Sequence, residues 1–475
     1  MADPCLKTPI VELVKVEDVQ AAASVNRDWR FWLIFTSIAV SLFLTALELT
    51  AVSTALPTIV SELHGTDFVW IAASYALAST AFVPMSGVLA QAFGRRPVMM
   101  GSLILFAVGS ALCGAAKSMN VLIVGRTIQG IGGGGIASLT QIILSDIVPL
   151  HERGVFNGII GVSWSVASGI GPVIGGSLAQ SGSWRWLFYL NIPICGLAML
   201  LVFLFLRLRT PEGTLKEKLG RLDWIGNFIV ISSTASCVIA LTWSGIKYEW
   251  SSLQVLVPLI VGIAGLVAFL GYEAKVSKCP MVPLTLMSTS TGLSGYLQTF
   301  IMPIILIANI YYTPVYFQSC LRQSPIASGV DTFGFAFTVA PIGIISGFSV
   351  AKIKQYRPQL WISWVLVIIG SALESTLRAD SPRILSIGYT MVIGAGLGIL
   401  TMTTYFPVLA PIHVSQNASA LALFTFLRNF AQVWGVSIGG TILQNKLATT
   451  LPADFKAQFP EGGAIAYAII PIMHI

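Results

Sequence analysis

The chain has 475 residues, of which 55% are hydrophobic and only 10% charged, and its formal net charge is +7. A soluble protein carries about 25% charged residues, so water cannot be the solvent for most of this surface. A mean hydropathy of +0.81 points to lipid instead. The basic residues stand singly or in pairs in short loops, a pattern that argues against nucleic-acid binding.

Apolar stretches long enough to cross a bilayer recur along the whole chain. A spanning helix needs about 20 apolar residues. Thirteen stretches qualify, separated by turn residues or charge: 32–56, 68–92, 98–116, 120–144, 155–180, 186–206, 224–244, 253–272, 294–317, 329–350, 360–377, 384–409 and 418–443. The sequence therefore predicts an all-α polytopic membrane protein with about thirteen transmembrane helices.

The distribution of lysine and arginine predicts the orientation. With a cytoplasmic N-terminus, seventeen of the 27 basic residues fall on the cytoplasmic side and eight on the external side, while Arg126 and Arg428 lie inside helices. The positive-inside rule then favours a cytoplasmic N-terminus. The longest charged connector, 208–223, follows the sixth stretch and marks a boundary between two halves. A weak repeat agrees, because 347–358 resembles 87–97.

The turn between the second and third stretches reads MSGVLAQAFGRRPVM over 85–99. Gly87 begins to open the helix, Gly94 breaks it, and Arg95 and Arg96 supply two adjacent charges. A glycine-broken turn with paired arginines between two spanning segments is expected at the cytoplasmic membrane face.

Two predicted helices carry ionisable residues at membrane depth. A carboxylate there costs roughly 2.5–3.5 kcal/mol, so Glu48, with Ser41 and Thr45 on its face, is expected to meet a cavity or a partner. Glu48 is either a proton carrier, an acid that recognises a cation, or a carboxylate that fixes helix packing. Arg126 and Gln129 share one face of the fourth stretch. Arg126 either stabilises a carboxylate, holds a polar face to a cavity, or extends to the membrane interface.

Two glycine-rich stretches lie inside apolar runs. The stretch 130–135 formally matches G-x-G-x-x-G, but no strand precedes it, so we interpret its glycines as helix contacts and not as a dinucleotide site. In the fifth stretch, Pro172 removes a backbone donor and predicts a kink, while Gly171 and Gly175 form a contact face that continues into Gly176. This segment is either a hinge for alternating access or a packing motif.

The second half offers one further candidate, Arg428, which either faces a cavity or packs near the cytoplasmic end of its helix. The six cysteines form no CxxC pair and the four histidines all lie outside the apolar runs, so no metal site is expected. No Walker lysine motif is present and the loops are short. We therefore expect no cofactor and no enzyme activity, and an ion gradient as the energy source.

Several motifs together carry a family resemblance. GVLAQAFGRRP (87–97) resembles the loop signature of the major facilitator superfamily, and GRTIQGIGGGG (125–135) and GPVIGG (171–176) resemble its helix-four arginine motif and its antiporter motif. LELTAVSTALPTIV (47–60), WRWLFYLNIP (184–193) and DWIGNF (223–228) resemble the fungal fourteen-helix drug:proton antiporter group.

The resemblance implies the major facilitator fold, in which two pseudo-symmetric helical bundles flank an inserted helix pair. The expected organisation is a cytoplasmic tail over 1–30, a six-helix bundle over 31–207, a linker with the inserted pair over 208–280, a second bundle over 281–445 and an external segment over 446–475. A fourteenth helix is expected in the family, whereas the stretch 464–475 is too short to span a bilayer.

The resemblance also implies a function: proton-coupled efflux of a drug, toxin or secondary metabolite by alternating access. It assigns Arg126 to proton coupling, GPVIGG to an antiporter-type kink that biases the cycle toward export, and the turn at 87–96 to a cytoplasmic gate loop. Glu48 and Gln129 join Arg126 as the candidates for proton coupling or for the cavity wall. In that loop Gln91 stands where the family has an acid, which removes a charge-based clasp. The alternatives are a proton-coupled uptake permease for a nutrient or siderophore, and a non-transporting paralogue.

The expected partners are a small-molecule substrate, protons and the lipid bilayer, with no nucleic acid. We expect a monomer in the plasma membrane, with the vacuolar membrane as the alternative location.

Overall fold

The computed structural model describes residues 29–63, 68–148, 153–206, 223–244, 248–277, 284–378, 380–412, 417–451 and 454. All thirteen predicted stretches are helical, and the described residues contain no strand beyond one isolated bridge. The helices are α2 (Trp29–Leu63), α3 (Val69–Phe93), α4 (Arg95–Gly114), α5 (Met119–Ile147), α6 (Arg153–Gln180), α7 (Arg185–Tyr189), α8 (Asn191–Phe205), α10 (Trp224–Trp243), α11 (Leu253–Lys275), η2 (Leu284–Met287), α12 (Ser290–Ser319), α13 (Pro325–Asp331), α14 (Phe333–Ile353), α15 (Arg357–Glu374), α16 (Arg383–Thr403), α17 (Tyr405–Leu409) and α18 (Asn417–Thr450).

Nine spans among the described residues are long and apolar enough to cross a membrane by length and composition alone. The helix α5 is not one of them, because Arg126, Gln129 and its run of glycines lower its hydropathy. These polar groups are buried against neighbouring helices and do not meet lipid. A helix inside the bundle can therefore be more polar than one at its surface.

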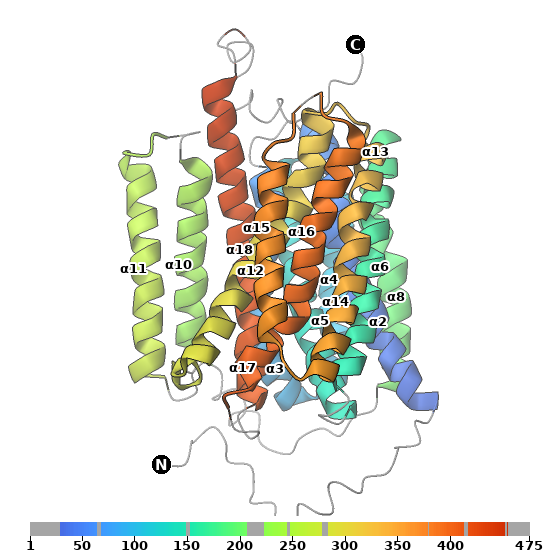
Figure 1. The fold of residues 1–475 in the computed structure, drawn as a ribbon, viewed down its shortest axis with the longest axis vertical. Helices are drawn as coiled ribbons and strands as arrows, with labels where there is room; N and C mark the ends of the chain where they lie inside the picture. The colour runs from blue at the N-terminus through green and yellow to red at the C-terminus, as the bar shows by residue number, and fades with distance from the viewer. Residues whose placement is uncertain are drawn as a thin grey trace, which may run out of the picture.

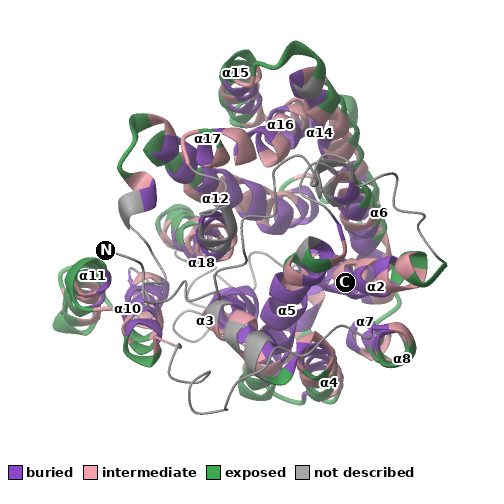
Figure 2. Ribbon diagram, turned by 90° about the horizontal axis from the view of Figure 1, so that it is seen from below, coloured by how far each residue is buried: buried purple, intermediate pink, exposed green. Residues whose placement is uncertain are grey.

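Helix packing repeats in the two halves. In the first half, α5 packs against α3 and α4, and α2 packs against α6. In the second half, α16 packs in the same way against α14 and α15, and α12 packs against α18. Viewed along the helix axes in Figure 2, the helices α2 to α8 and α12 to α17 form two groups, and buried residues gather on their inner faces. This is the two-bundle arrangement that the resemblance implied.

The pair α10 and α11 stands beside the bundles (Figures 1 and 2). Hydrogen bonds tie α10 to the rest, because Asn227 donates to the Ala81 carbonyl of α3 at 3.3 Å and Asn445 of α18 donates to the Ser244 carbonyl at 3.0 Å. From α11, Phe269 is buried in an apolar cluster with residues of α12 and α18. Along α11, Leu253 is 75% exposed, as expected for a surface that faces lipid. Of the connector 208–223 that we predicted before this pair, residues 208–222 lie outside the described part.

Two tight turns connect helices at the predicted cytoplasmic face. Gly94 has a φ of 92° and is the one residue between α3 and α4, so the chain reverses there in a conformation that side chains rarely adopt. Its repeat counterpart is Lys354, which follows α14 with a φ of 56°. The sequence predicted the break at Gly94. The turn at Lys354 was harder to locate, because the residue with the positive φ there is not a glycine.

Glycines allow α5 to lie directly against its two neighbours. A Cβ at Gly132 would lie 2.5 Å from the Phe106 nitrogen of α4, and one at Gly134 would overlap the Ser79 carbonyl of α3. These short approaches confirm the interpretation of this stretch as a helix contact, because a side chain at either position would push backbones apart.

We predict that Gly134→Ala destabilises the protein by about 1–3 kcal/mol, since its methyl group would meet backbone atoms that cannot move aside. The matched control is Gly101→Ala on α4, where a Cβ would have no neighbour within 4 Å. Thermal unfolding of the purified protein in nanodiscs measures both variants. Equal midpoints for the two variants would contradict the packing argument.

The two halves meet mainly at the predicted external ends of their helices. A Cβ at Gly176 of α6 would overlap the Pro325 carbonyl of α13, and a Cβ at Gly329 would overlap the Pro172 carbonyl. Gln318 of α12 donates to the Thr54 carbonyl of α2 at 3.0 Å. These contacts close the predicted external side between the halves.

Candidate functional site

A buried ion pair lies inside the first half. The Arg126 Nη1 of α5 is 2.6 Å from the Glu48 Oε1 of α2, and both side chains have zero solvent exposure. The two residues lie on different helices and are 78 positions apart in the chain. The structure thus brings together the two ionisable residues that the sequence placed on separate helices, and it gives each the partner that membrane depth requires.

Hydrogen bonds hold the Arg126 guanidinium in one orientation. Its Nη1 also donates to the Gln129 Oε1 at 2.7 Å, and its Nε donates to the Ile71 carbonyl at 2.9 Å. The Tyr75 ring lies 4.6 Å from the guanidinium carbon. Gln129 in turn donates to the Ser110 Oγ at 2.8 Å, which connects α4 to the same network. A charge fixed by this many neighbours responds to any movement of α2, α3 or α4.

Two contributors to the site were missed in the sequence. Asn191, the first residue of α8, is buried and donates through Nδ2 to the Glu48 Oε2. The signal was present, because Asn191 belongs to the WRWLFYLNIP stretch, but a neutral amide at a helix start is common. Tyr311 of α12 is buried in electrostatic contact with Arg126 and Glu48, so the second half also reaches the ion pair.

The gate loop retains an ion pair without an acid at position 91. Arg95 Nε lies 2.8 Å from the Asp146 Oδ2, at the end of α5. Arg96 donates to the Phe203 carbonyl of α8, and its guanidinium lies 4.5 Å from the Phe203 ring. Arg95 thus has an acidic partner on α5, and the expected loss of a clasp at position 91 stays a prediction. The side chain of Gln91 itself lies outside the described part, and Gly87 packs loosely near Ile142 of α5.

The antiporter-type segment packs on both of its neighbours. Cβ atoms at Gly171 and Gly175 would overlap Thr50 and the Ala51 carbonyl of α2, whereas Gly176 faces α13 of the second half. The helix α6 continues through Pro172 from Arg153 to Gln180. These small residues place α6 at the junction of the two halves.

A small cavity lies between the halves beside this segment. Its volume is about 30 Å³, room for about two water molecules. The lining residues come from α2, α6, α12, α14 and α16 and from Thr332 between α13 and α14: Thr50, Trp164, Ser168, Pro172, Asn309, Ile310, Thr313, Pro314, Thr332, Phe335, Ala336, Val339 and Thr390. Substrate pockets are typically 300–1,000 Å³, so the halves are closed on this space.

Comparison with known proteins decides the family. The model described as Major Facilitator Superfamily matches residues 38–436. The chain belongs to the major facilitator superfamily. It is therefore a multi-pass membrane transporter and not an enzyme, as the sequence predicted.

Curated relatives and solved structures agree with this membership. The "Efflux pump FUS6" of Gibberella moniliformis is 39% identical over 467 residues, covering 97% of this chain and 83% of that protein. The "MFS-type efflux pump LUC4" of a Fusarium species is 40% identical over 453 residues, covering 94% and 80%. A partially occluded inward-open structure of the xylose transporter XylE from E. coli matches with a TM-score of 0.58 at 14% identity, over 93% of this chain and 95% of that one, which shows the shared fold.

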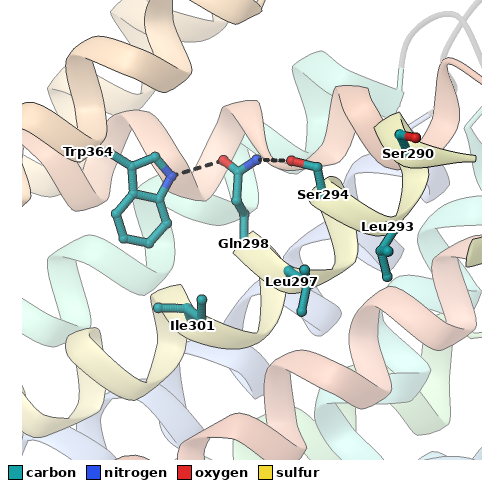
Figure 3. A pocket seen from close by; sticks show the side chains of 7 residues that line it. All are labelled: Ser290, Leu293, Ser294, Leu297, Gln298, Ile301 and Trp364. Atoms are coloured by element: carbon teal, nitrogen blue, oxygen red, sulfur yellow. Dashed lines mark hydrogen bonds between the residues drawn. The ribbon is translucent and has the colours of Figure 1, made fainter.

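A larger groove, of about 460 Å³, lies on the outer surface of this transporter between α12 and α15. Figure 3 shows the Trp364 indole pointing to the Gln298 amide, which it reaches at 3.0 Å, while Gln298 donates to Ser294 at 3.0 Å. Leu297 on its wall is 52% exposed. The groove is lined by the second half alone, so rocking of the halves cannot carry it across the membrane. In the first half, α8 occupies the corresponding position against α2 and α4.

Arg428 takes no part in the central site. Its guanidinium lies 5.4 Å from the Phe424 ring on the same helix, it does not line the cavity, and no acidic side chain among the described residues pairs with it. It is partly buried, which fits packing within the second half. In the described part of the chain, no group of three or more His, Cys, Asp or Glu is arranged to hold a metal.

Separating the ion pair tests how strongly it holds the first half together. We predict that Arg126→Gln and Glu48→Gln each lower stability by about 3–5 kcal/mol, because each leaves a buried charge without its counter-ion. The double variant is expected to lose less than the sum of the two, since neither charge remains. Thermal unfolding in nanodiscs gives the coupling. Additive losses would mean that the two residues act independently.

Proposed function

We propose that this transporter exports small amphipathic molecules in exchange for protons, by alternating access of the cavity between its halves. The observation that carries the proposal is the fully buried Glu48–Arg126 pair, a titratable carboxylate at membrane depth whose neighbours extend into both halves. No other described acid is both fully buried in the first half and paired within the bundle.

Protonation of Glu48 supplies the coupling step. A proton on this carboxylate removes the charge that balances Arg126, and the guanidinium then has only neutral partners: the Gln129 amide, the Ile71 carbonyl and the Tyr75 ring. A buried cation without a counter-ion costs several kcal/mol, so the protonated state favours movement of the surrounding helices. Release of the proton on the other side restores the ion pair and the present packing.

The same helix connects the ion pair to the cavity. Glu48 lies on α2 two residues before Thr50, which lines the cavity and packs on Gly171. Movement of α2 therefore changes the proton site and the space between the halves together. In the proposed cycle, α6, α13 and α14 form the contact on which the halves rock.

The relatives support the proposed direction of transport, and the proposed location depends on that direction. Proteins 39% and 40% identical to this chain are named efflux pumps, which supports export over uptake. Because export from the cell needs a transporter in the plasma membrane, we propose that location, with Arg95, Arg96 and Asp146 at the cytoplasmic face.

Replacing the acid is expected to abolish coupling. In Glu48→Gln, proton-driven export should fall below about one tenth of the wild-type rate, because the side chain can no longer exchange a proton at membrane depth. Proteoliposomes with an imposed pH gradient measure export, and a protonophore should stop it in the wild type. Glu48→Asp keeps the acid and is expected to retain pH dependence.

Glu62→Gln is the matched control. Glu62 lies at the C-terminal end of α2, where it is partly exposed and pairs with Arg185. This variant should keep the wild-type response to the pH gradient. Export that persists undiminished in Glu48→Gln, or that ignores the protonophore in the wild type, would refute the proposal.

A further inference from the structure

The cavity between the halves has an uncharged lining. Of the described residues around it, none is acidic, basic or a histidine. Glu48 and Arg126 lie outside the lining and are already paired with each other at 2.6 Å. The space that opens when the halves separate therefore offers a ligand hydrogen bonds and apolar contact, and no counter-charge.

Most hydroxyl groups in the lining already donate their hydrogen bond to a backbone carbonyl of their own helix or turn. Thr50 donates to the Ala46 carbonyl at 2.9 Å, Thr332 to Gly329 at 2.7 Å and Thr390 to Ile387 at 2.9 Å. The amide nitrogen of Asn309 likewise donates to the Ile305 carbonyl at 2.9 Å. What these groups present to the cavity is chiefly oxygen lone pairs, so they accept hydrogen bonds from a ligand.

Two lining hydroxyls, those of Ser168 and Thr313, donate no such bond within the described residues, and Ser168 is the more buried of the two. Its side chain is 94% buried, because only 6% is exposed, and its Oγ has no hydrogen-bond partner among the described residues. Other serines of α6 do have partners; Ser165, for example, donates to the Gly161 carbonyl at 2.9 Å. A buried hydroxyl left unpaired in the cavity wall is costly unless a ligand or water completes it. Ser168 is thus a free donor and acceptor directed to the space between the halves.

We infer that the cavity selects uncharged, hydroxyl- or amide-bearing molecules with an apolar or aromatic body. The Trp164 and Phe335 rings in the lining provide the surface for that body, and Ser168 together with the threonine oxygens binds its polar groups. An ionised ligand group entering this space would lose its hydration without meeting an opposite charge, so cations and anions are excluded. This inference rests on the proposed transport through the cavity, and it names the class of substrate.

Three probes that share one fluorophore and differ in charge test whether the cavity excludes charged molecules. N-(2-hydroxyethyl)dansylamide is neutral, dansylcadaverine is cationic and dansylglycine is anionic at neutral pH. Their binding to the full chain in nanodiscs of neutral lipid is measured by the rise in dansyl emission, with empty nanodiscs as the background. We expect the neutral probe to bind at least about tenfold more tightly than either charged probe. Equal or tighter binding of a charged probe, or no binding of the neutral one, would overturn the inference.

Variants of α6 locate the binding. Ser168→Ala should weaken the neutral probe by about 2- to 12-fold, the effect of one hydrogen bond. Ser165→Ala, on the same helix but outside the lining, should leave it unchanged. Ser168→Asp should shift the preference toward dansylcadaverine. Unchanged affinity in Ser168→Ala would contradict the assigned role of this hydroxyl, and the wild-type probe series stands even where a variant fails to fold.

The binding measurement is independent of the proton cycle. It is made at equilibrium without a pH gradient, so probe selectivity can hold while proton-driven export fails. That result would overturn the proposed coupling and leave the substrate class standing. Proton-driven export together with a preference for the cationic probe would support the proposed coupling and overturn the substrate class.

Discussion

A single buried ion pair imposes conditions on the whole first half of this transporter. The guanidinium of Arg126 has no water to solvate it, so α2 must supply Glu48, α3 must supply the Ile71 carbonyl, and the neighbouring turn of α5 must supply Gln129. Each requirement fixes a helix position to within a hydrogen-bond length. The glycines of α5 meet the remaining condition, because only bare backbone surfaces bring α3 and α4 close enough for these groups to reach the charge. The buried charge is therefore neutralised only when the helices of the first half are closely packed.

The same conditions explain what the sequence could predict. The apolar stretches located the long helices of the described residues, because a residue that faces lipid must be apolar whatever its neighbours are. The break at Gly94 follows from backbone geometry alone. Glu48 and Arg126 were recognisable one at a time, since an ionisable residue in an apolar run is rare. Their pairing was left open, because it depends on which faces of α2 and α5 meet, and the spacing within either helix does not contain that information.

The functional residues that we did not predict have no distinctive local sequence, and their role depends on where the fold places them. Asn191 is a polar residue at a helix start, Asp146 an acid at a helix end, and Tyr311 one of a run of aromatic residues. Ser168 has no local feature that separates it from Ser165, although their hydrogen bonding differs. Such residues acquire a role from helices that lie far away in the chain. Longer-range contact information would be needed to find them.

The bare surfaces of α6 have a consequence for rate. Gly171 and Gly175 touch α2 by backbone alone, and Gly176 meets α13 in the same way. Interdigitated side chains must change rotamer in a concerted manner before two helices can slide, whereas smooth backbone surfaces lose little contact as they turn. A contact of this kind lowers the barrier between conformations without favouring either one. In the proposed cycle, the glycines of α6 would then set how fast the transporter turns over, while the proton and the substrate decide which side it opens to.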